Sequence, residues 1–106
     1  MTPEERFDAV VETLRAQTGV TVGRMFGSPG LKVGGKVFSM LVKGRLVVKL
    51  PRQRVEAIIA SGSGEYFDPG HGWPSKEWVA IHPNDESHWL NVSEEAMNFV
   101  TSKIVG

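Results

Sequence analysis

The sequence predicts an α+β fold in two layers, with a five-stranded, mostly antiparallel sheet and helices packed on one face of it. Three segments, near the two ends and in the middle of the chain, repeat apolar residues at helical spacing. The segments between them are rich in β-branched residues or alternate polar and apolar residues, as strands do. Glycine-containing turns join several of these strands directly, and short connections of that kind link antiparallel strands. The expected element order is α-β-β-β-α-β-β-α.

The chain is predicted to form one domain over residues 1–106, which is long enough to bury a single core. It has no cysteine, so disulfide bonds and thiol chemistry are excluded. No apolar run is long enough to cross a bilayer, and the acidic, amphipathic N-terminus does not resemble a secretory or transit peptide. We therefore expect a cytoplasmic protein without a membrane partner.

Residues 2–17 are predicted to form the first helix. Thr2 suits the N-cap, Pro3 suits the first helical position, and Glu5 completes a capping box. The buried stripe is expected to consist of Phe7, Val10, Val11 and Leu14. Gly19 is expected to end the helix.

Residues 21–26, 37–42 and 46–50 are predicted strands. Residues 27–30 and the pair Gly34–Gly35 are typical of turns. At Lys43–Gly44 we expect an odd-length loop or a bulge, since that register gathers six apolar residues on one face: Phe38, Met40, Val42, Leu46, Val48 and Leu50. The opposite, half-apolar face would suit a partner or a second copy of the chain, which leaves a homodimer open.

The second half of the chain is predicted to begin with a short helix over residues 51–60. A long polar and aromatic loop over residues 64–75 follows, and loops of that length are often functional. Residues 77–82 and 87–92 are predicted strands, with Trp78 partly in the core and Trp89 on the outer face of the sheet. Ser93 is expected to cap a final helix whose buried stripe is Ala96, Val100 and Ile104.

Positive charge is concentrated in the first half of the chain, although the formal net charge is zero. Residues 13–55 contain nine Lys or Arg and no Asp or Glu, whereas residues 56–106 contain eight acids and only two lysines. Such a segment can attract an anionic partner. The alternative is that the acidic half folds back and neutralises it.

No complete catalytic or ligand-binding motif is present in the sequence. Residues 30–37 match the phosphate-loop spacing for seven positions, but Val37 occupies the place of the required Ser or Thr and the segment opens into a predicted strand, which favours a hairpin turn. His71, His82 and His88 do not fix a metal-binding geometry. No nucleophile stands in a recognisable pairing with a base. We therefore expect a non-catalytic protein without a cofactor or metal.

The candidate site is an anion-binding or partner-binding surface made of Arg24, Lys36, Lys49 and Lys76 together with Trp73. The four cations lie near or within predicted strands, and Trp73 lies in the 64–75 loop, where an exposed tryptophan would suit a binding hot spot. The structural alternative is that these cations pair with acids on neighbouring strands, Glu77 among them.

Several short stretches together resemble the signature of the TfoX/Sxy N-terminal domain family. They are GRMFG at residues 23–27, Gly30–Leu31, KVF at residues 36–38, LVVK at residues 46–49, Phe67, and KEW at residues 76–78. The resemblance implies an α+β fold related to YjbR-like proteins and to the secretion-chaperone architecture. It also implies an association with the regulation of natural competence, acting through other proteins, and we expect a stand-alone N-terminal domain.

Taken with the absence of catalytic motifs, the resemblance favours a small regulatory or interaction module with an unknown protein partner. Two alternatives stay open. The first is a nucleic-acid-binding protein that uses the basic segment 24–54. The second is a small-ligand binder or enzyme with the 64–75 loop as a lid over a pocket.

Overall fold

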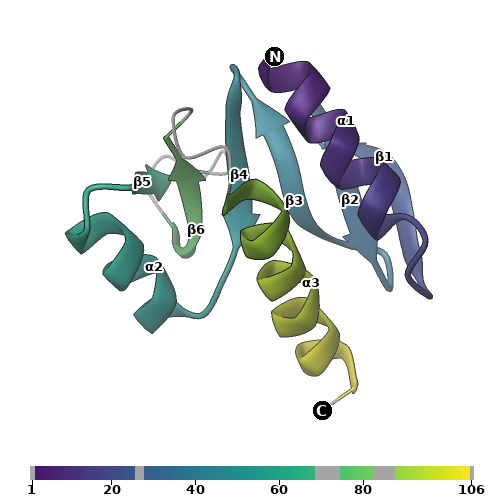
Figure 1. The fold of residues 1–106 in the computed structure, drawn as a ribbon. Coiled ribbons are helices and arrows are strands. Elements are labelled where there is room, and N and C mark those ends of the chain that lie inside the picture. The colour runs from purple at the N-terminus through teal and green to yellow at the C-terminus, as the bar shows by residue number, and fades with distance from the viewer. Residues whose placement is uncertain (1, 26–27, 69–74, 83–87, 106) are drawn as a thin grey trace.

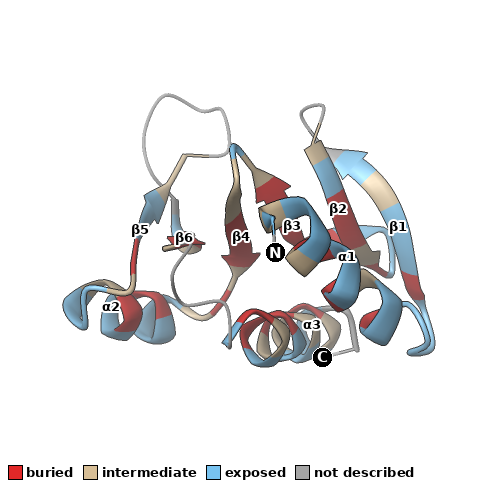
Figure 2. Ribbon diagram, turned by 45° about the horizontal axis from the view of Figure 1, so that its top comes forward, coloured by how far each residue is buried: buried red, intermediate tan, exposed pale blue. Residues whose placement is uncertain are grey.

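Three helices lie against one face of a six-stranded antiparallel sheet (Figure 1). The structure is a computed structural model and describes residues 2–25, 28–68, 75–82 and 88–105. In chain order its elements are α1 (Pro3–Leu14), β1 (Val20–Met25), β2 (Ser28–Val33), β3 (Lys36–Val42), β4 (Arg45–Lys49), α2 (Arg52–Ala60), β5 (Gly64–Phe67), β6 (Ser75–Ile81) and α3 (Trp89–Val105). The predicted α+β class and the placement of the helices on one face are confirmed (Figure 2).

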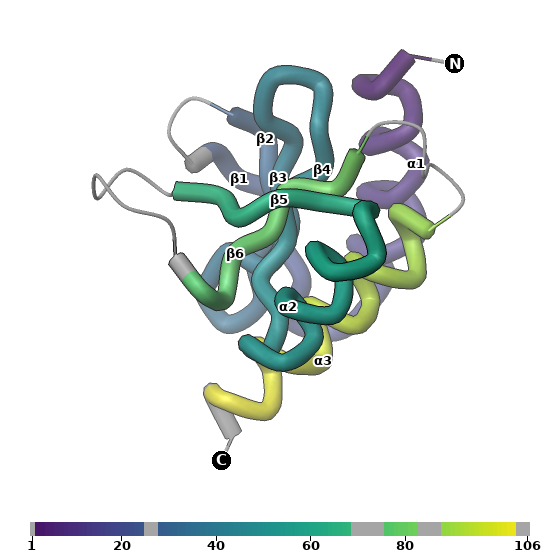
Figure 3. Tube along the Cα trace, turned by 90° about the vertical axis from the view of Figure 1, so that its left-hand side faces the viewer, coloured from purple at the N-terminus to yellow at the C-terminus, as the bar shows by residue number. Residues whose placement is uncertain are grey.

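The sheet has the strand order β1-β2-β3-β4-β6-β5, and every neighbouring pair is antiparallel. The first four strands follow one another as a meander, whereas β6 lies between β4 and β5. Viewed from the β5 edge, α2 and α3 lie on the same side of the sheet (Figure 3). The predicted count of five strands is wrong, because the described part of the chain contains six, in the order α-β-β-β-β-α-β-β-α.

Helix α1 begins as predicted and ends earlier than predicted. The backbone N–H of Glu5 donates to Thr2 Oγ1 at 3.1 Å, and the Thr2 N–H donates to Glu5 Oε1 at 3.0 Å, which together form the capping box. Phe7, Val10 and Leu14 are buried. The helix ends at Leu14 rather than at residue 17, and the chain then passes through Gly19 into β1.

Two-residue turns connect β2 to β3 and β3 to β4. Lys43 and Gly44 have φ of 51° and 78°, and the register pairs Val42 with Arg45 and Met40 with Val47. The predicted odd-length loop or bulge at Gly44 is therefore wrong, since positive φ at both positions gives the turn whose twist matches the two strands. As a result Met40 and Val42 lie on the face away from the helices.

A bulge in β3 brings Phe38 to the helix side of the sheet. Leu31 pairs with Ser39 while Lys32 pairs with Val37, so Phe38 is the extra residue. Strand β2 itself was predicted as a turn because of Pro29 and Gly30. It runs instead between β1 and β3 as a regular strand.

Four of the predictions for the second half of the chain are corrected by the structure. Gly64–Phe67, predicted as the start of a loop, is the edge strand β5. The predicted strand 87–92 is wrong where the structure describes it, because α3 already begins at Trp89. Trp89 is 1% exposed in the core between helices and sheet rather than on the outer face, and Ser93 is buried rather than capping a helix. The segment alternates like a strand, but Trp89, Val92, Ala96 and Val100 also follow helical spacing, and burial selects the helix.

The apolar residues form two clusters, one on each face of the sheet. The larger cluster lies under the three helices and includes the fully buried Leu46, Val48 and Leu50. The smaller one, called here the outer cluster, contains Val37, Met40, Val47 and Ala80, with Val42, Phe67 and Trp78 packed against it. None of the helices in the described part of the chain combines the length and the apolar character needed to cross a membrane.

Candidate functional site

The structure separates the four predicted cations rather than gathering them at one place. Lys36 opens β3 beside the hairpin at Gly34–Gly35, Lys49 closes β4, and Lys76 is near the start of β6. The antiparallel order puts these three strand ends at the same end of the sheet. Arg24 lies next to the end of β1, opposite Pro29, and therefore at the other end. Trp73 lies outside the described residues.

Lys49 is a partly neutralised cation. Its Nζ lies 3.9 Å from Glu77 Oε1 and 5.9 Å from the centroid of the Trp78 ring, with its side chain 30% exposed. Glu77 also accepts hydrogen bonds from Lys103 Nζ at 3.0 and 3.1 Å. The predicted role of Glu77 as a counter-ion on a neighbouring strand is thus confirmed for Lys49.

Acids from the second half of the chain neutralise part of the basic segment. Arg45 Nη1 lies 3.2 Å from Glu65 Oε1, and Arg54 Nε lies 2.8 Å from Glu95 Oε2, so each arginine forms an ion pair. Within the described residues, four lysines form no ion pair: Lys32, Lys36, Lys43 and Lys76. The positive field of the segment is therefore reduced, and what remains of it lies on lysines.

Some of these cations border the outer cluster. Lys32 is paired with Val37 in the β2–β3 register, and directly paired residues point to the same face of a sheet. Lys49 shares the face of Val47 and lies over Trp78. Among the described residues no helix covers this face (Figure 2). The face therefore combines an apolar centre with a cationic border.

The segment with phosphate-loop spacing is a hairpin, as predicted. Gly30 lies within β2, Gly34 and Gly35 form the turn with φ of 58° and 81°, and Lys36 starts β3. No helix follows, so no row of helical amides faces the glycines. No cluster of metal-ligating side chains is present among the residues that the structure describes, and His71 lies outside them.

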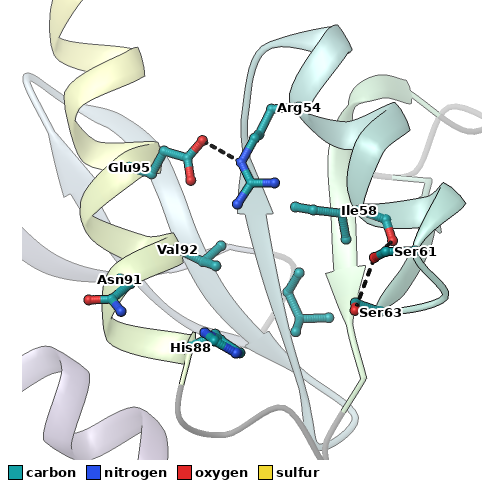
Figure 4. Close-up of a pocket in the computed structure, with 9 residues that line it drawn as sticks. Arg54, Ile58, Ser61, Ser63, His88, Asn91, Val92 and Glu95 are labelled. Atoms are coloured by element: carbon teal, nitrogen blue, oxygen red, sulfur yellow. Dashed lines mark hydrogen bonds and ion pairs between the residues drawn. The ribbon is translucent and has the colours of Figure 1, made fainter.

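An open pocket that the sequence analysis missed lies between α2 and α3 (Figure 4). Its volume is about 370 Å³, within the range of small-molecule sites. Ile58, Ile81 and Val92 supply its apolar surface, and Arg54, Ser63, His88 and Glu95 are among its polar residues. The pocket exists because α2 packs on β5 and β6 whereas α3 packs on β3 and β4, which leaves a gap between the two helices.

The polar side of the pocket is organised by Arg54 and Glu95. Arg54 Nε donates to Glu95 Oε2 at 2.8 Å, so the contact joins α2 to α3. The two terminal guanidinium nitrogens make no hydrogen bond to any residue that the structure describes, and they point toward the cavity (Figure 4). At the far wall, Ser61 Oγ donates to the carbonyl oxygen of Ile58 at 2.8 Å and lies 3.1 Å from Ser63 Oγ.

The comparison with protein families agrees with the fold and with the sequence resemblance. No curated protein matches the sequence. The TfoX N-terminal domain matches residues 12–100, a range that runs from α1 into α3 and contains the whole sheet. Because this match covers most of the chain, the protein belongs to the TfoX N-terminal domain family.

Proposed function

We propose that this TfoX N-terminal domain is a non-catalytic interaction module that binds an acidic protein partner through the outer face of its sheet. The observation that carries the proposal is the outer cluster, on a face that no helix of the described chain covers. Its four central residues are buried, and the apolar surface that a partner would contact comes from the half-buried residues packed against them, Val42, Phe67 and Trp78. Its half-buried members Phe67 and Trp78 are the residue types that dominate binding energy at protein interfaces.

The border of this face supports an acidic partner. Lys76 lies two residues before Trp78 on β6, so it shares the outer face with Trp78. Lys32 and Lys76 form no ion pair within the described part of the chain, and Lys49 shares its counter-ion Glu77 with Lys103. Charged residues around an apolar centre raise association rates and select partners of opposite sign. Of the predicted surface, Lys49 and Lys76 thus keep a proposed role, whereas Arg24 lies at the other end of the sheet.

Membership of the family is the reason to propose a regulatory role for the interaction. In this proposal the domain acts in the cytoplasm by binding its partner, and it catalyses no reaction itself. The process that it regulates would be one such as natural competence. Nucleic-acid binding is the less favoured alternative, because Arg45, Lys49 and Arg54 already pair with acids of the same chain. It predicts binding that weakens steeply with salt.

The test is affinity capture with matched charge-reversal variants, quantified by mass spectrometry. The test variant combines Lys32→Glu with Lys76→Glu. The control combines Arg15→Glu with Arg52→Glu, which changes the net charge equally on the helix side, at residues whose side chains are 57% and 61% exposed. We expect one acidic protein to be retained by the wild type and the control and to be lost from the test variant, with thermal unfolding unchanged. Equal retention by all three proteins would contradict the proposal.

A further inference from the structure

The pocket between α2 and α3 combines a small apolar surface with a larger number of polar residues. Ile58, Ile81 and Val92 contribute from three different elements to its apolar surface. The remaining residues place polar groups around that surface (Figure 4). In small-molecule sites an apolar surface holds the apolar part of the ligand, and converging polar groups fix its orientation. The large polar share of this pocket therefore favours a ligand with a polar or charged group.

The guanidinium group of Arg54 selects the charge of the ligand. Glu95 engages only Nε, at 2.8 Å, and leaves both terminal nitrogens free to donate. A planar fork of two parallel N–H donors matches a carboxylate, which can accept both hydrogen bonds at once. The rotation of this fork is limited because the Nε bond ties the group to α3.

Glu95 sets an upper limit on the negative charge. Its carboxylate is also part of the pocket wall, so the Arg54–Glu95 pair has no net charge. A dianion on Arg54 would face like-charge repulsion from Glu95, whereas a single carboxylate keeps most of the attraction. The arrangement therefore favours a monoanion.

We infer that this pocket binds a small monocarboxylate that carries a compact apolar group. The carboxylate accepts from the terminal nitrogens of Arg54, and the apolar group packs between Ile58 on α2 and Val92 on α3, over Ile81. His88 directly precedes α3 and lies on the same side of the cavity as Val92 (Figure 4). It forms no hydrogen bond with the described residues, so its ring is available to the ligand. This site is separate from the outer sheet face and does not depend on the proposed function.

The experiment is a titration of the whole, isotopically labelled protein with benzoate and with its neutral counterpart benzamide, followed by the NMR shifts of the backbone amides. We expect saturable shifts for benzoate at Ile58, Ser63 and Val92. Benzamide is expected to bind at least about tenfold more weakly, since hydrogen bonds to charged groups contribute about 1.5–3 kcal/mol. No saturable benzoate binding, or binding that maps away from these residues, would overturn the inference.

Three variants separate a charge-specific site from a merely structural one. Arg54→Gln is expected to weaken benzoate binding about tenfold, because the glutamine cannot supply a charged fork. Glu95→Gln is expected to strengthen it by roughly two- to fivefold, because a competing negative charge is removed. Arg52→Gln, two residues earlier on α2 and paired with Glu56, is the matched control and leaves the affinity unchanged. Equal affinity for benzoate and benzamide, or a loss of binding in both pocket variants, would refute a carboxylate site.

Discussion

Ser39 Oγ and Ser93 Oγ lie 3.0 Å apart, fully buried, where the central strand β3 meets α3. Each hydroxyl is the hydrogen-bond partner of the other across the main core. Small side chains at this position also let the helix approach the sheet closely. The pair therefore joins two elements that are far apart in the sequence.

Removing one hydroxyl of this pair is expected to destabilise the protein, because the other hydroxyl stays buried. Ser39→Ala leaves the Ser93 hydroxyl buried without its partner, at a cost of about 1–3 kcal/mol in the free energy of unfolding. The double variant, with Ser93→Ala added, should lose less than the sum of the two single changes. Urea unfolding of the four proteins gives the coupling energy, and a coupling of zero would show that the bond contributes nothing.

The capping box of α1 is expected to stabilise the N-terminal helix. Thr2→Ala removes the hydroxyl that accepts from the Glu5 N–H at 3.1 Å. The expected loss is about 1 kcal/mol, measured by chemical denaturation. Thr2→Ser keeps the acceptor and serves as the control. A wild-type stability for Thr2→Ala would contradict this assignment.

The same box lowers the pKa of Glu5 below its ordinary value of 4.5, chiefly through the hydrogen bond from the Thr2 backbone N–H and then through the Thr2 side chain. Because the pKa in the folded protein is depressed, the stabilisation is fully present above pH 4.5 and is lost as the pH falls through the lowered pKa. We expect Thr2→Ala to raise this pKa part of the way back. An NMR titration of the Glu5 carboxyl carbon measures it, and an unchanged midpoint would exclude a contribution from the hydroxyl.

Gly64 is expected to tolerate no side chain. A Cβ there would lie 2.7 Å from the carbonyl oxygen of Ala80 and 3.1 Å from methyl groups of Ile58 and Val79. Gly64→Ala should cost about 1–3 kcal/mol through overpacking and should speed hydrogen exchange in β6. Gly62→Ala is the comparison, since that site has open space and a φ of +80°, and it should leave exchange in β6 unchanged. Identical exchange in both variants would contradict a clash at Gly64.

Trp89 is expected to tolerate phenylalanine better than alanine. Trp89 is 1% exposed, yet its Nε1 hydrogen has no acceptor within the part of the chain that the structure describes. Trp89→Phe loses some packing but removes the unpaired donor, so it should cost less than about 1.5 kcal/mol. Trp89→Ala should cost about 3–5 kcal/mol through the cavity that it leaves. Thermal unfolding distinguishes the two, and equal losses would indicate that the indole N–H does have a partner.

Local signals explain which parts of the fold the sequence predicts well. The start of α1 and most of α2 depend on capping residues, helix-breaking residues and a stripe of apolar residues within one helix. All of these signals come from residues that are close together in the sequence. Strands β2 and β5 were missed for the opposite reason. Gly30 and Gly64 are typical of turns, but here they occupy strands beside a neighbouring backbone carbonyl. A Cβ would lie 3.2 Å from Ser39 O at Gly30, which is a tight contact, and 2.7 Å from Ala80 O at Gly64, which leaves no room. The need for glycine at these two positions therefore comes from the tertiary structure and not from a turn.

The hairpin register and the pocket were missed because each depends on more than a local pattern. Both faces of β3 and β4 carry apolar residues, so two hairpin registers would each bury an apolar face. The prediction assumed that only one face is apolar, and it therefore selected the wrong register. The pocket is lined from α2, α3 and β6 and from the segment that joins α2 to β5, and the residues of its central contact, Arg54 and Glu95, are 41 positions apart. No spacing rule connects them.

The position of β6 between β4 and β5 has a consequence for how the chain folds. Strands β1 to β4 are neighbours in both sequence and space, so short loops suffice to assemble them quickly. Strand β6 must instead pair with both β4 and β5, which are separated in the chain by α2. Its pairing with β4 therefore closes a longer loop and costs more entropy. We therefore expect the insertion of β6 to set the folding rate, and α2 and β5 to gain their protection from hydrogen exchange only after it.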